Sequence, residues 1–569
     1  MAMNSSFASM ISKMRGYRAW LVILGFVLST FLQLRVGMAA ESHKNSEVRE
    51  SVLAEFSLWQ GRLAEGNEKR SAEVVQKGLA LAKQRAGLMR QLMRENPERA
   101  LAAALKPAAR EKLPEHLHEF LEEHVSGYAS VGQLFDCGHF KMARAIQLNG
   151  KLYLAHSAES NRVPVRLRQN VPLRGVVLGS EIALSDNPLE LAEPEEVLKE
   201  GSHWRKGDRC VGCGKSLEGS LRSVAAKFAG RIMPLCQREH VSRIRLTGAI
   251  AGLDGGSSGT TPGPSPDWTQ GSKRLLYIVT QFAGQGSPPT SRATAESALA
   301  QVAQYFDAQS YQKTALTSVV TDPITVPQTV SYYTSFGLAQ LYNDTVIVAR
   351  AAGWDADDYD FVFIRHAGGP GGAGVGLVGD KGAWVQTDSW PVLAHELGHN
   401  YGLMHANGWR PKTSLASGVG ETVEYADAFD MMGPNRGSFN SYERSVLHWM
   451  PDWAVQRVTN SGIYRLNAFD VSALGSNQLY AIVVRKDIRD YWLDYRGEFL
   501  TGELAPFALN GLQIHWPQWS QSRGGSTLVD TTPGTPRQFE DAPLAVGHTL
   551  SDLQAGVHIT ALNRSPVEG

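Results

Sequence analysis

The sequence predicts a multidomain α+β protein: a helical plus small β-barrel N-terminal region, a central α/β domain and a C-terminal β domain. Three observations support this prediction. The chain has 569 residues, more than a single hydrophobic core usually serves. Its 43% hydrophobic and 20% charged residues are typical of a folded globular protein. Along the chain, the spacing of apolar residues changes from helical to strand-like and then to a mixed order.

Changes in composition and periodicity divide the chain into seven segments. These are a signal peptide (1–40), a helical region (41–128), a small β domain (129–190), a cysteine-containing region (191–251), a linker (252–272), an α/β domain (273–457) and a C-terminal β domain (458–569). The linker is the clearest boundary, because its Gly, Ser and Pro residues supply no apolar core.

The N-terminus has the pattern of a secretory signal. Lys13, Arg15 and Arg18 precede an apolar run at 19–34, and small residues follow near Ala39. The run is short of the about 20 apolar residues that span a bilayer, so a retained signal anchor is the less favoured alternative. We therefore expect a secreted, extracellular protein that has no membrane contact after signal cleavage. Periplasmic and signal-anchored forms are the other interpretations.

The next two segments differ in periodicity. Residues 41–128 are rich in good helix formers at helical spacing, which predicts two to four helices. From residue 129 the apolar residues alternate, and Asn149-Gly150 suits a tight hairpin turn because both residues accept a positive φ. A small β-barrel or sheet is therefore predicted over 129–190.

Beyond the linker, the pattern predicts an α/β order. We expect a buried strand at 274–282, an amphipathic helix at 293–310, a second helix at 335–353 and a strand at 359–366. The remainder from about residue 458 is strand-rich with turn signals, which predicts the C-terminal β domain.

The chemistry lies in the segment HELGHNYGLMH. His395 and His399 are four residues apart, so on a helix they share one face and can hold one ion. Glu396 lies beside them, within reach of a metal-bound water. Gly402 tolerates the positive φ of a sharp turn, after which His405 supplies a third nitrogen. Three imidazoles leave one zinc position open for water, as catalytic zinc requires.

This ligand set predicts metal-assisted peptide hydrolysis. Zinc lowers the pKa of bound water from about 15.7 to roughly 7, and Glu396 would accept its proton and pass it to the leaving amine. Asp388 or Ser389 can cap the helix, and Pro391 suits its first turn. The alternative is a closed structural zinc site, which normally has a fourth protein ligand.

The pattern HExxHxxGxxH resembles that of the metzincin clan of zinc proteases, whose third histidine follows a glycine turn. EYADAFDMMG at 424–433 resembles the methionine turn of that clan. The resemblance implies that Met432, rather than Met431, lies under the metal as an apolar floor without being a ligand. No tyrosine stands two residues after Met432, so the tyrosine of astacin-like enzymes has no counterpart there.

The finer resemblance is to the gametolysin (autolysin) family and its bacterial relatives. It rests on HELGHNYGLMHA, EYADAFDMMG, FNSYERSVLHWM, YWLDYR and LVDTTPGTP with DAPLAVG, and covers about 272–560. It implies a secreted zinc metalloendopeptidase with a metzincin-like catalytic domain, acting on extracellular or cell-wall proteins. We therefore expect a protein or peptide substrate. The chain departs from the family at His448, where we expect glycine.

The glycine-rich segment 368–388 precedes the motif helix. A phosphate-binding loop is not supported, because the segment lacks the lysine and following helix of a P-loop. In metzincins an edge strand here pairs with the substrate backbone. The resemblance implies this role for about 373–377, whose glycines would permit close approach of a second chain.

Four cysteines, Cys137, Cys210, Cys213 and Cys236, all precede the α/β domain. Three interpretations stay open. An even count in an exported protein suggests two disulfides. The spacing Cys210-x2-Cys213 with Cys236-x3-His240 has the shape of a second, structural Cys3His zinc site. A latency thiol could instead cap the catalytic zinc until the N-terminal region is removed.

Charge patterns are less informative. The 56 basic and 56 acidic residues cancel, so no nucleic-acid partner is expected. Asp355, Asp357, Asp358 and Asp360 could bind Ca²⁺, but they lack the glycine and distant glutamate of an EF-hand, which favours a solvated turn. Asp494 and Arg496, two residues apart, are interpreted as a structural pair.

Two alternatives to the protease remain at the level of sequence. A non-catalytic zinc-binding adhesion or binding protein could retain the fold, although such descendants usually lose the base or a ligand. A zinc amidase acting on cell-wall peptides would not need the glycine and methionine turns. We also hypothesise that residues 41–250 form a propeptide cleaved in the linker. The sequence predicts neither the substrate nor the oligomeric state.

Overall fold

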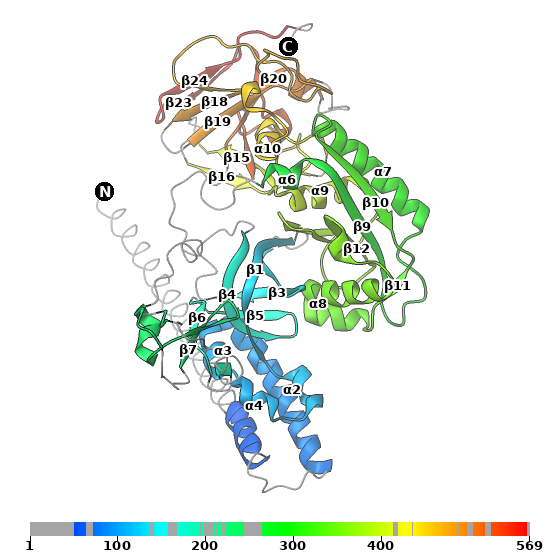
Figure 1. Cartoon of the computed structure of the whole chain (residues 1–569). Helices are drawn as coiled ribbons and strands as arrows, with labels where there is room; N and C mark the ends of the chain where they lie inside the picture. The colour runs from blue at the N-terminus through cyan, green and yellow to red at the C-terminus, as the bar shows by residue number, and fades with distance from the viewer. Residues whose placement is uncertain are drawn as a thin grey trace, which may run out of the picture. The chain divides into compact units, whose positions relative to one another are not determined.

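A computed structural model of the protein is shown in Figure 1. It describes residues 51–63, 72–136, 141–157, 168–185, 187–193, 196–197, 209–211, 213–217, 224–243, 264–412, 419–434, 436–486, 489–497, 505–517 and 525–565. The predicted signal peptide and Cys137 lie outside these residues. Among the described helices, none combines the length and apolar character needed to cross a membrane.

The chain divides into two compact units, which are described separately. The first comprises Met1–Glu95 and Ala102–Glu123. Its helices are residues 51–63, α2 (Ala72–Glu95), α4 (Pro107–Glu111) and the 3-10 helix η1 (Glu115–Phe120). Phe56, Trp59, Leu81, Leu117 and Leu121 form its core, as expected from their helical spacing. A buried ion pair between Arg85 and Glu122 joins α2 to the end of the unit.

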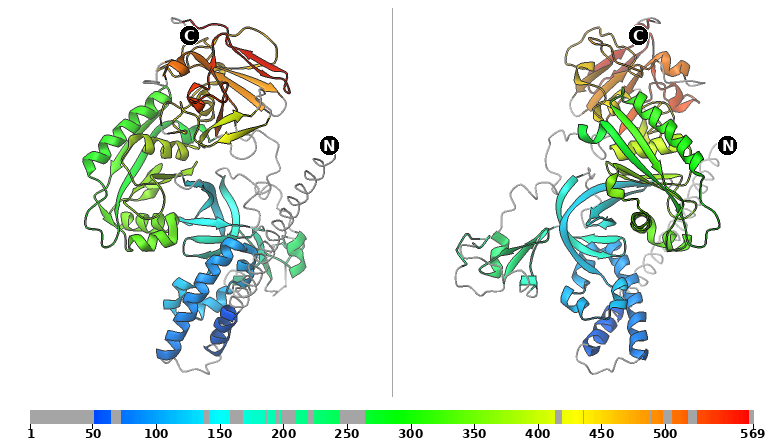
Figure 2. Two further views of the ribbon diagram at one scale, coloured as in Figure 1. Left: turned by 180° about the vertical axis from the view of Figure 1, so that it is seen from behind. Right: turned by 45° about the vertical axis from the view of Figure 1, so that its right-hand side comes forward.

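The second unit comprises Asn96–Leu101 and His124–Gly569. It begins with five barrel strands, β1 (Glu123–Asp136), β2 (Lys141–Leu148), β3 (Lys151–His156), β4 (Arg168–Leu178) and β5 (Glu181–Leu184). Their order is β1-β2-β3-β5-β4, and a β1–β4 pairing closes the barrel (Figure 2). The predicted barrel is confirmed, and Asn149 (φ 53°) with Gly150 (φ 75°) makes its predicted hairpin turn.

The α/β region is built on strands β9 (Gly271–Gln281), β10 (Thr314–Val320), β12 (Phe361–Arg365), β13 (Gly374–Val378) and β14 (Gly382–Val385). Their order is β10-β9-β12-β14-β13, with β13 antiparallel to β14 and the other neighbours parallel. Both predicted strands and both predicted helices, α7 (Arg292–Gln309) and α8 (Val330–Ala351), are confirmed.

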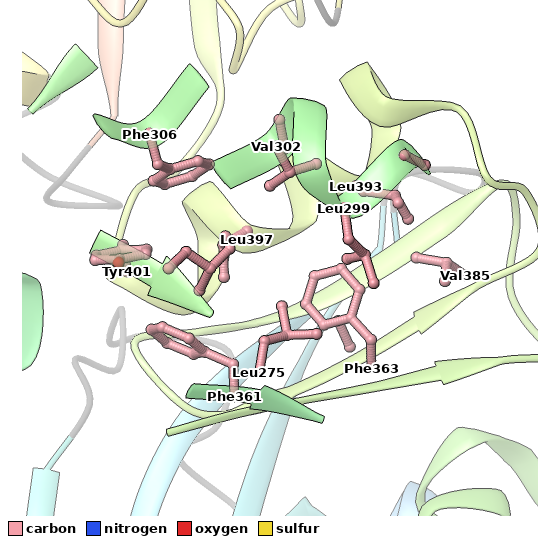
Figure 3. Close-up of a cluster of buried hydrophobic side chains, with 14 of the residues drawn as sticks. Leu275, Leu299, Val302, Phe306, Phe361, Phe363, Val385, Leu393, Leu397 and Tyr401 are labelled. Carbon is pink, nitrogen blue, oxygen red and sulfur yellow. The ribbon is translucent and has the colours of Figure 1, made fainter. Parts of the chain in front are cut away.

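Alternate residues of β9 enter two different cores because successive side chains of a strand point to opposite faces. Leu275 and Tyr277 pack with α7 and α9 (Trp390–Tyr401), whereas Leu276 and Ile278 pack with α8. Figure 3 shows the first core, in which α9 side chains such as Leu397 point toward the strands. The core therefore fixes the helix that carries the histidine motif.

An eight-stranded sheet forms the C-terminal region. Its order is β16 (Gly420–Val423), β15 (Ala406–Pro411), β21 (Ser526–Val529), β20 (Gly511–His515), β19 (Arg489–Asp494), β18 (Ala481–Lys486) and β17 (Val455–Val458), with β22 (Leu544–Ala545) paired to β20. Strands β15 and β16 come from the predicted α/β domain. The sheet thus continues across the predicted boundary at 457/458, because β15 pairs in parallel with β21.

The predicted linker is shorter than its composition indicated. Residues 252–263 lie outside the described part, but α6 (Pro266–Thr269) and the start of β9 occupy its end. Trp268 anchors this stretch, because its Nε1 donates a hydrogen bond to the Asn400 carbonyl at 2.9 Å and its ring packs edge-on against Phe361. One partly buried aromatic side chain therefore outweighs the surrounding glycine-rich composition.

Several shorter elements complete the second unit. They are α3 (Pro97–Ala103), which crosses between the units in sequence, β6 (Leu189–Leu191), β7 (Ala225–Phe228), β8 (Arg231–Pro234), the 3-10 helix η2 (Arg238–Arg243), β11 (Ile324–Thr325), α10 (Ser441–Val446), α11 (Ala505–Leu509), β23 (Thr549–Asp552) and β24 (Val557–Thr560). Strands β6, β7 and β8 form a separate three-stranded sheet in the cysteine-containing region.

Candidate metal centre

Helix α9 begins and ends at residues that suit its termini. Ser389 is the N-cap by position, with Pro391 in the first turn, but it makes no side-chain capping hydrogen bond. Asp388 does not cap the helix either, since its carboxylate accepts from Tyr277 Oη at 2.7 Å and from Arg365. At the other end Gly402 has φ 116°, which confirms the predicted glycine turn.

The turn brings the three motif histidines together. His395, His399 and His405 are buried, and one nitrogen from each lies within 4.8 Å of the others. Nδ1 of His395 donates to the Met431 carbonyl at 2.9 Å, and Nδ1 of His399 donates to the Leu403 carbonyl at 2.8 Å. Because a carbonyl can only accept, these bonds fix the tautomer and make Nε2 the ligand atom that each ring offers.

The surroundings keep the three rings in the form that binds metals. Burial lowers the pKa of His395 to about 4 and that of His399 to about 3, with nearby His395 as a second cause for His399. Burial also lowers the pKa of His405 well below its usual value. All three imidazoles are therefore neutral at neutral pH, as metal ligation requires. The donor set fits a tetrahedral ion with one position left for another ligand.

Glu396 is buried on the same helix, and strand β13 makes room for its carboxylate. A Cβ added at Gly374 would lie 2.6 Å from Glu396 Cδ, and one at Gly376 would lie 3.1 Å from Glu396 Oε2. Neither glycine has a positive φ, so close approach, rather than a turn, is what requires glycine at both positions. Close approach of the motif helix therefore accounts for both glycines, whereas the resemblance implied close approach of a second chain.

Met432 packs against α9 from the other direction. A Cβ at Gly398 would meet its Sδ at 2.5 Å, so the sulfur lies directly against the helix between His395 and His399. The side chains of Met432 and Met431 are both fully buried, whereas the backbone of Met431 provides the carbonyl for His395. This packing supports Met432 as the apolar floor.

Two residues of the centre were missed by the sequence reasoning. Oε1 of Glu424 lies 3.0 Å from Nδ1 of His405, which orients the third ring as the carbonyls orient the other two. The Tyr425 ring packs against His405 in a tilted arrangement, with centroids 3.9 Å apart. Both stand at the start of EYADAFDMMG, but nothing local in that stretch indicates that it folds back onto His405.

The predicted edge strand is not an edge in this structure. The last four residues of β1 pair antiparallel with β13, with Gln133 opposite Val378 and Asp136 opposite Val375. Strand β14 occupies the other side of β13. The predicted pairing of 373–377 with a substrate backbone would therefore require β1 to be displaced.

The acidic segment around Asp355 is not arranged as a calcium cage. Arg350 Nη2 contacts Asp355 at 2.8 Å and Asp357 at 3.0 Å, and Lys381 contacts Asp357 at 3.2 Å. Cationic side chains thus neutralise these carboxylates. The described residues contain two groups with metal-ligand geometry, namely the three histidines and the Cys210, Cys213, Cys236 and His240 cluster.

Asp494 and Arg496 are both buried. Each forms its contacts with other residues and not with its predicted partner. Arg496 pairs with Asp430 at 3.7 Å, and Asp494 accepts from Ser441 Oγ at 2.6 Å. The interpretation as a direct pair was therefore wrong, although both residues are structural. The network reaches the methionine turn, because Asp430 also accepts from the Met432 backbone N–H at 2.8 Å.

His448 has a structural explanation. Its φ is 61°, a left-handed conformation in which glycine is the residue with least strain. Its Nε2 donates to the Pro264 carbonyl at 2.8 Å, so the ring is part of the fold.

The comparison with protein-family models agrees with the motif. Residues 291–491 match the family model described as Gametolysin peptidase M11, which confirms the predicted resemblance over that segment. The segment includes the three histidines, Glu396 and Met432. Among solved structures, the chain is similar to metalloproteinase-II from Bacteroides fragilis, with 12% identity over 57% of this chain and 90% of that chain, and a TM-score of 0.21. No curated protein sequence matches the chain. The family match supports a metallopeptidase acting on peptides or proteins.

Proposed function

We propose that this protein is a zinc-dependent endopeptidase that is secreted and cleaves extracellular or cell-wall proteins. The observation that carries the proposal is the convergence of three neutral, buried imidazoles beside the buried carboxylate of Glu396. A Cys-free set of three nitrogen donors with one open position is typical of catalytic rather than structural zinc.

His395, His399 and His405 would hold the ion through Nε2. When bound, zinc supplies Lewis acidity that polarises the scissile carbonyl and lowers the pKa of water to roughly 7. Glu396 then accepts the proton of the attacking water and delivers it to the nitrogen of the leaving amine. The carboxylate does this without a covalent intermediate, because no nucleophilic side chain is required.

The position of Glu396 shields the proposed base from bulk water. The glycines of β13 bring backbone against the carboxylate and exclude bulk water from that side. Glu424 and the carbonyls of Met431 and Leu403 fix the orientations of the three imidazole rings. The metal ligands therefore do not have to reorganise when a substrate binds.

The test compares wild type with Glu396→Gln and His395→Ala, each as the full chain and after proteolytic nicking in 252–263. Zinc is measured by elemental analysis, and cleavage is measured on a denatured mixed-protein substrate with and without a chelator. We expect Glu396→Gln to keep zinc and to lose at least about 10²-fold in rate, the lower range for a general base. We expect His395→Ala to lose this zinc. Wild-type turnover by Glu396→Gln would refute the assigned base.

Secretion is tested separately. The full gene with its N-terminus is expressed, and the N-terminal residue of the protein recovered outside the cell is determined. Recovery starting near Ala39 or Ala40 supports a cleaved signal, and a cell-bound protein that retains 19–34 supports the anchor.

A further inference from the structure

A second cluster of metal-binding side chains lies far along the sequence from the histidine motif. Cys210 and Cys213 flank a tight turn in which the Gly214 N–H donates to the Cys210 carbonyl at 2.8 Å. The Cys210 N–H in turn donates to the Lys215 carbonyl at 2.9 Å. Such a turn directs both sulfur atoms to the same side. Gly214 has φ 75°, so a side chain at this position would be strained.

The other two members come from the far side of the β7–β8 hairpin. Cys236 follows β8 directly, and His240 lies in η2. His240 Nδ1 is 3.1 Å from Cys236 Sγ and 3.5 Å from Cys210 Sγ, and the Cys213 and Cys236 sulfurs are 3.6 Å apart. All four ligand atoms lie within 4.8 Å of one another.

These distances are those of the edges of a zinc tetrahedron. With Zn–S near 2.3 Å and Zn–N near 2.0–2.1 Å, tetrahedral geometry places sulfurs about 3.8 Å apart and sulfur and nitrogen about 3.6 Å apart. A disulfide needs sulfurs about 2.05 Å apart. No disulfide joins Cys210, Cys213 and Cys236 to one another, so the disulfide interpretation does not hold among these three.

The surroundings also suit a metal. Cys210 and His240 are 1% and 5% exposed, which is costly for polar groups unless they are satisfied. The Gln237 amide lies 2.8 Å from His240 Nε2, on the ring nitrogen that does not face the sulfurs. An outer partner of this kind orients a ligating imidazole.

We propose that Cys210, Cys213, Cys236 and His240 bind a structural zinc ion. Four protein ligands leave no position for water or substrate, so this ion has no part in hydrolysis. Its task is to hold the three-stranded sheet together. The hydrophobic cluster in the described part of this region is small, with Leu189, Phe228 and Leu235 as its larger buried side chains, and a core of that size needs a cross-link.

Metal stoichiometry of the full chain tests this site independently of catalysis. We expect about two zinc ions in wild type and one in His395→Ala. We expect one in Cys213→Ser and none in the double variant. Cys213→His is the matched control, because Cys2His2 also binds zinc tetrahedrally and should restore the ion.

A second readout leaves the four proposed ligands of this site unchanged. In His395→Ala, cobalt replaces zinc and the cobalt–thiolate absorption is recorded, and thiol reactivity is measured before and after chelation. We expect the absorption to appear, and three additional thiols to react only after metal removal. A metal-free His395→Ala protein, or a Cys213–Cys236 disulfide found by mass spectrometry in it, would overturn the proposal.

A different observation, the β1–β13 pairing, carries a second inference that rests on the proposed function. Leu134 of β1 is buried in the same core as Val375 and Leu377 of β13. The barrel has another anchor, because Asn343 of α8 accepts from the Leu152 N–H and donates to the Leu152 carbonyl, both at 2.8 Å. The pairing is thus held by side chains as well as by backbone.

The side of β13 that β1 covers is the one on which an added peptide strand would form hydrogen bonds. Asp136 stands opposite Val375, one residue from the glycine that contacts Glu396. We infer that β1 competes with substrate for this strand, so the full chain is latent until cleavage in 252–263 lets the barrel leave.

The test places a site-specific protease sequence within 252–263 and measures hydrolysis before and after the cut. We expect the rate to rise at least tenfold after cutting, with release of the N-terminal fragment seen by size-exclusion chromatography. Leu134→Asp should raise the rate of the uncut chain, and the exposed Lys151→Asp is the matched control. Equal, measurable rates before and after the cut would refute latency and leave the proposed function standing. No hydrolysis in either state, with zinc bound, refutes the proposed function.

Discussion

Gly374 offers a sharp test of the proposed active-site geometry, because one added methyl group there meets the carboxylate of Glu396, the proposed base. The new Cβ of Gly374→Ala would lie 2.6 Å from Glu396 Cδ and 2.7 Å from Glu396 Cγ. Carbon atoms in contact are separated by about 3.5–4.0 Å, so the carboxylate must move by roughly 1 Å. The three atoms nearest to this methyl group all belong to Glu396.

A displacement of about 1 Å at a catalytic group costs on the order of 10²-fold in rate, which corresponds to about 2.7 kcal/mol in the activation barrier. We therefore expect kcat of the nicked Gly374→Ala enzyme to fall about 10²-fold while zinc content stays at the wild-type level. Overpacking should also lower the free energy of unfolding by about 1–3 kcal/mol.

Gly382→Ala is the matched control for overpacking. Its Cβ would lie 2.9 Å from Leu377 Cδ1, in the neighbouring strand and away from Glu396. It should be destabilised to a similar degree yet keep its kcat. The reasoning is refuted if Gly374→Ala retains wild-type kcat, or if both variants lose activity in proportion to their stability.

Three further predictions concern the support of the site. Glu424→Ala removes the carboxylate that orients His405, so zinc affinity measured by chelator competition should fall about 10–100-fold; unchanged affinity would exclude this role. Gly402→Ala places a side chain at φ 116° and against Pro264, so denaturant unfolding should show a loss of at least about 1–2 kcal/mol. Burial, with nearby Asp427, raises the pKa of Asp430 to about 6 from 3.8. Its contribution to stability is therefore present below about pH 3.8 and lost as pH rises through about 6, and Asp430→Asn should flatten that part of the stability curve.

The local elements were largely predictable. The four-residue spacing of His395 and His399, and the glycine at 402, are encoded within eleven residues and need only helix geometry. Asn149-Gly150 predicted its own hairpin because the conformational preference belongs to the two residues themselves. The helix at 293–310 and the strand at 359–366 followed from periodicity in the same way.

What was missed involves contacts between distant segments. Glu424 meets His405 across nineteen positions, and β15 joins β21 across more than a hundred. The predicted end of the linker was wrong around Trp268, because the indole of this residue donates a hydrogen bond to the backbone of α9. Residue composition is averaged over a window of the sequence, so it carries no information about a single contact of this kind.

By itself, the sequence determined the candidate ligand set and the proposed chemistry, since metal ligation depends on residue type and on a spacing shorter than one helix. Only the tertiary structure decided which residues orient the histidines and that the glycines of β13 accommodate Glu396. It alone also showed that β1 covers the strand beside the site and that three cysteines meet one histidine. These arrangements depend on strand register and on side chains that meet only after the chain folds, for which short-range periodicity carries no signal.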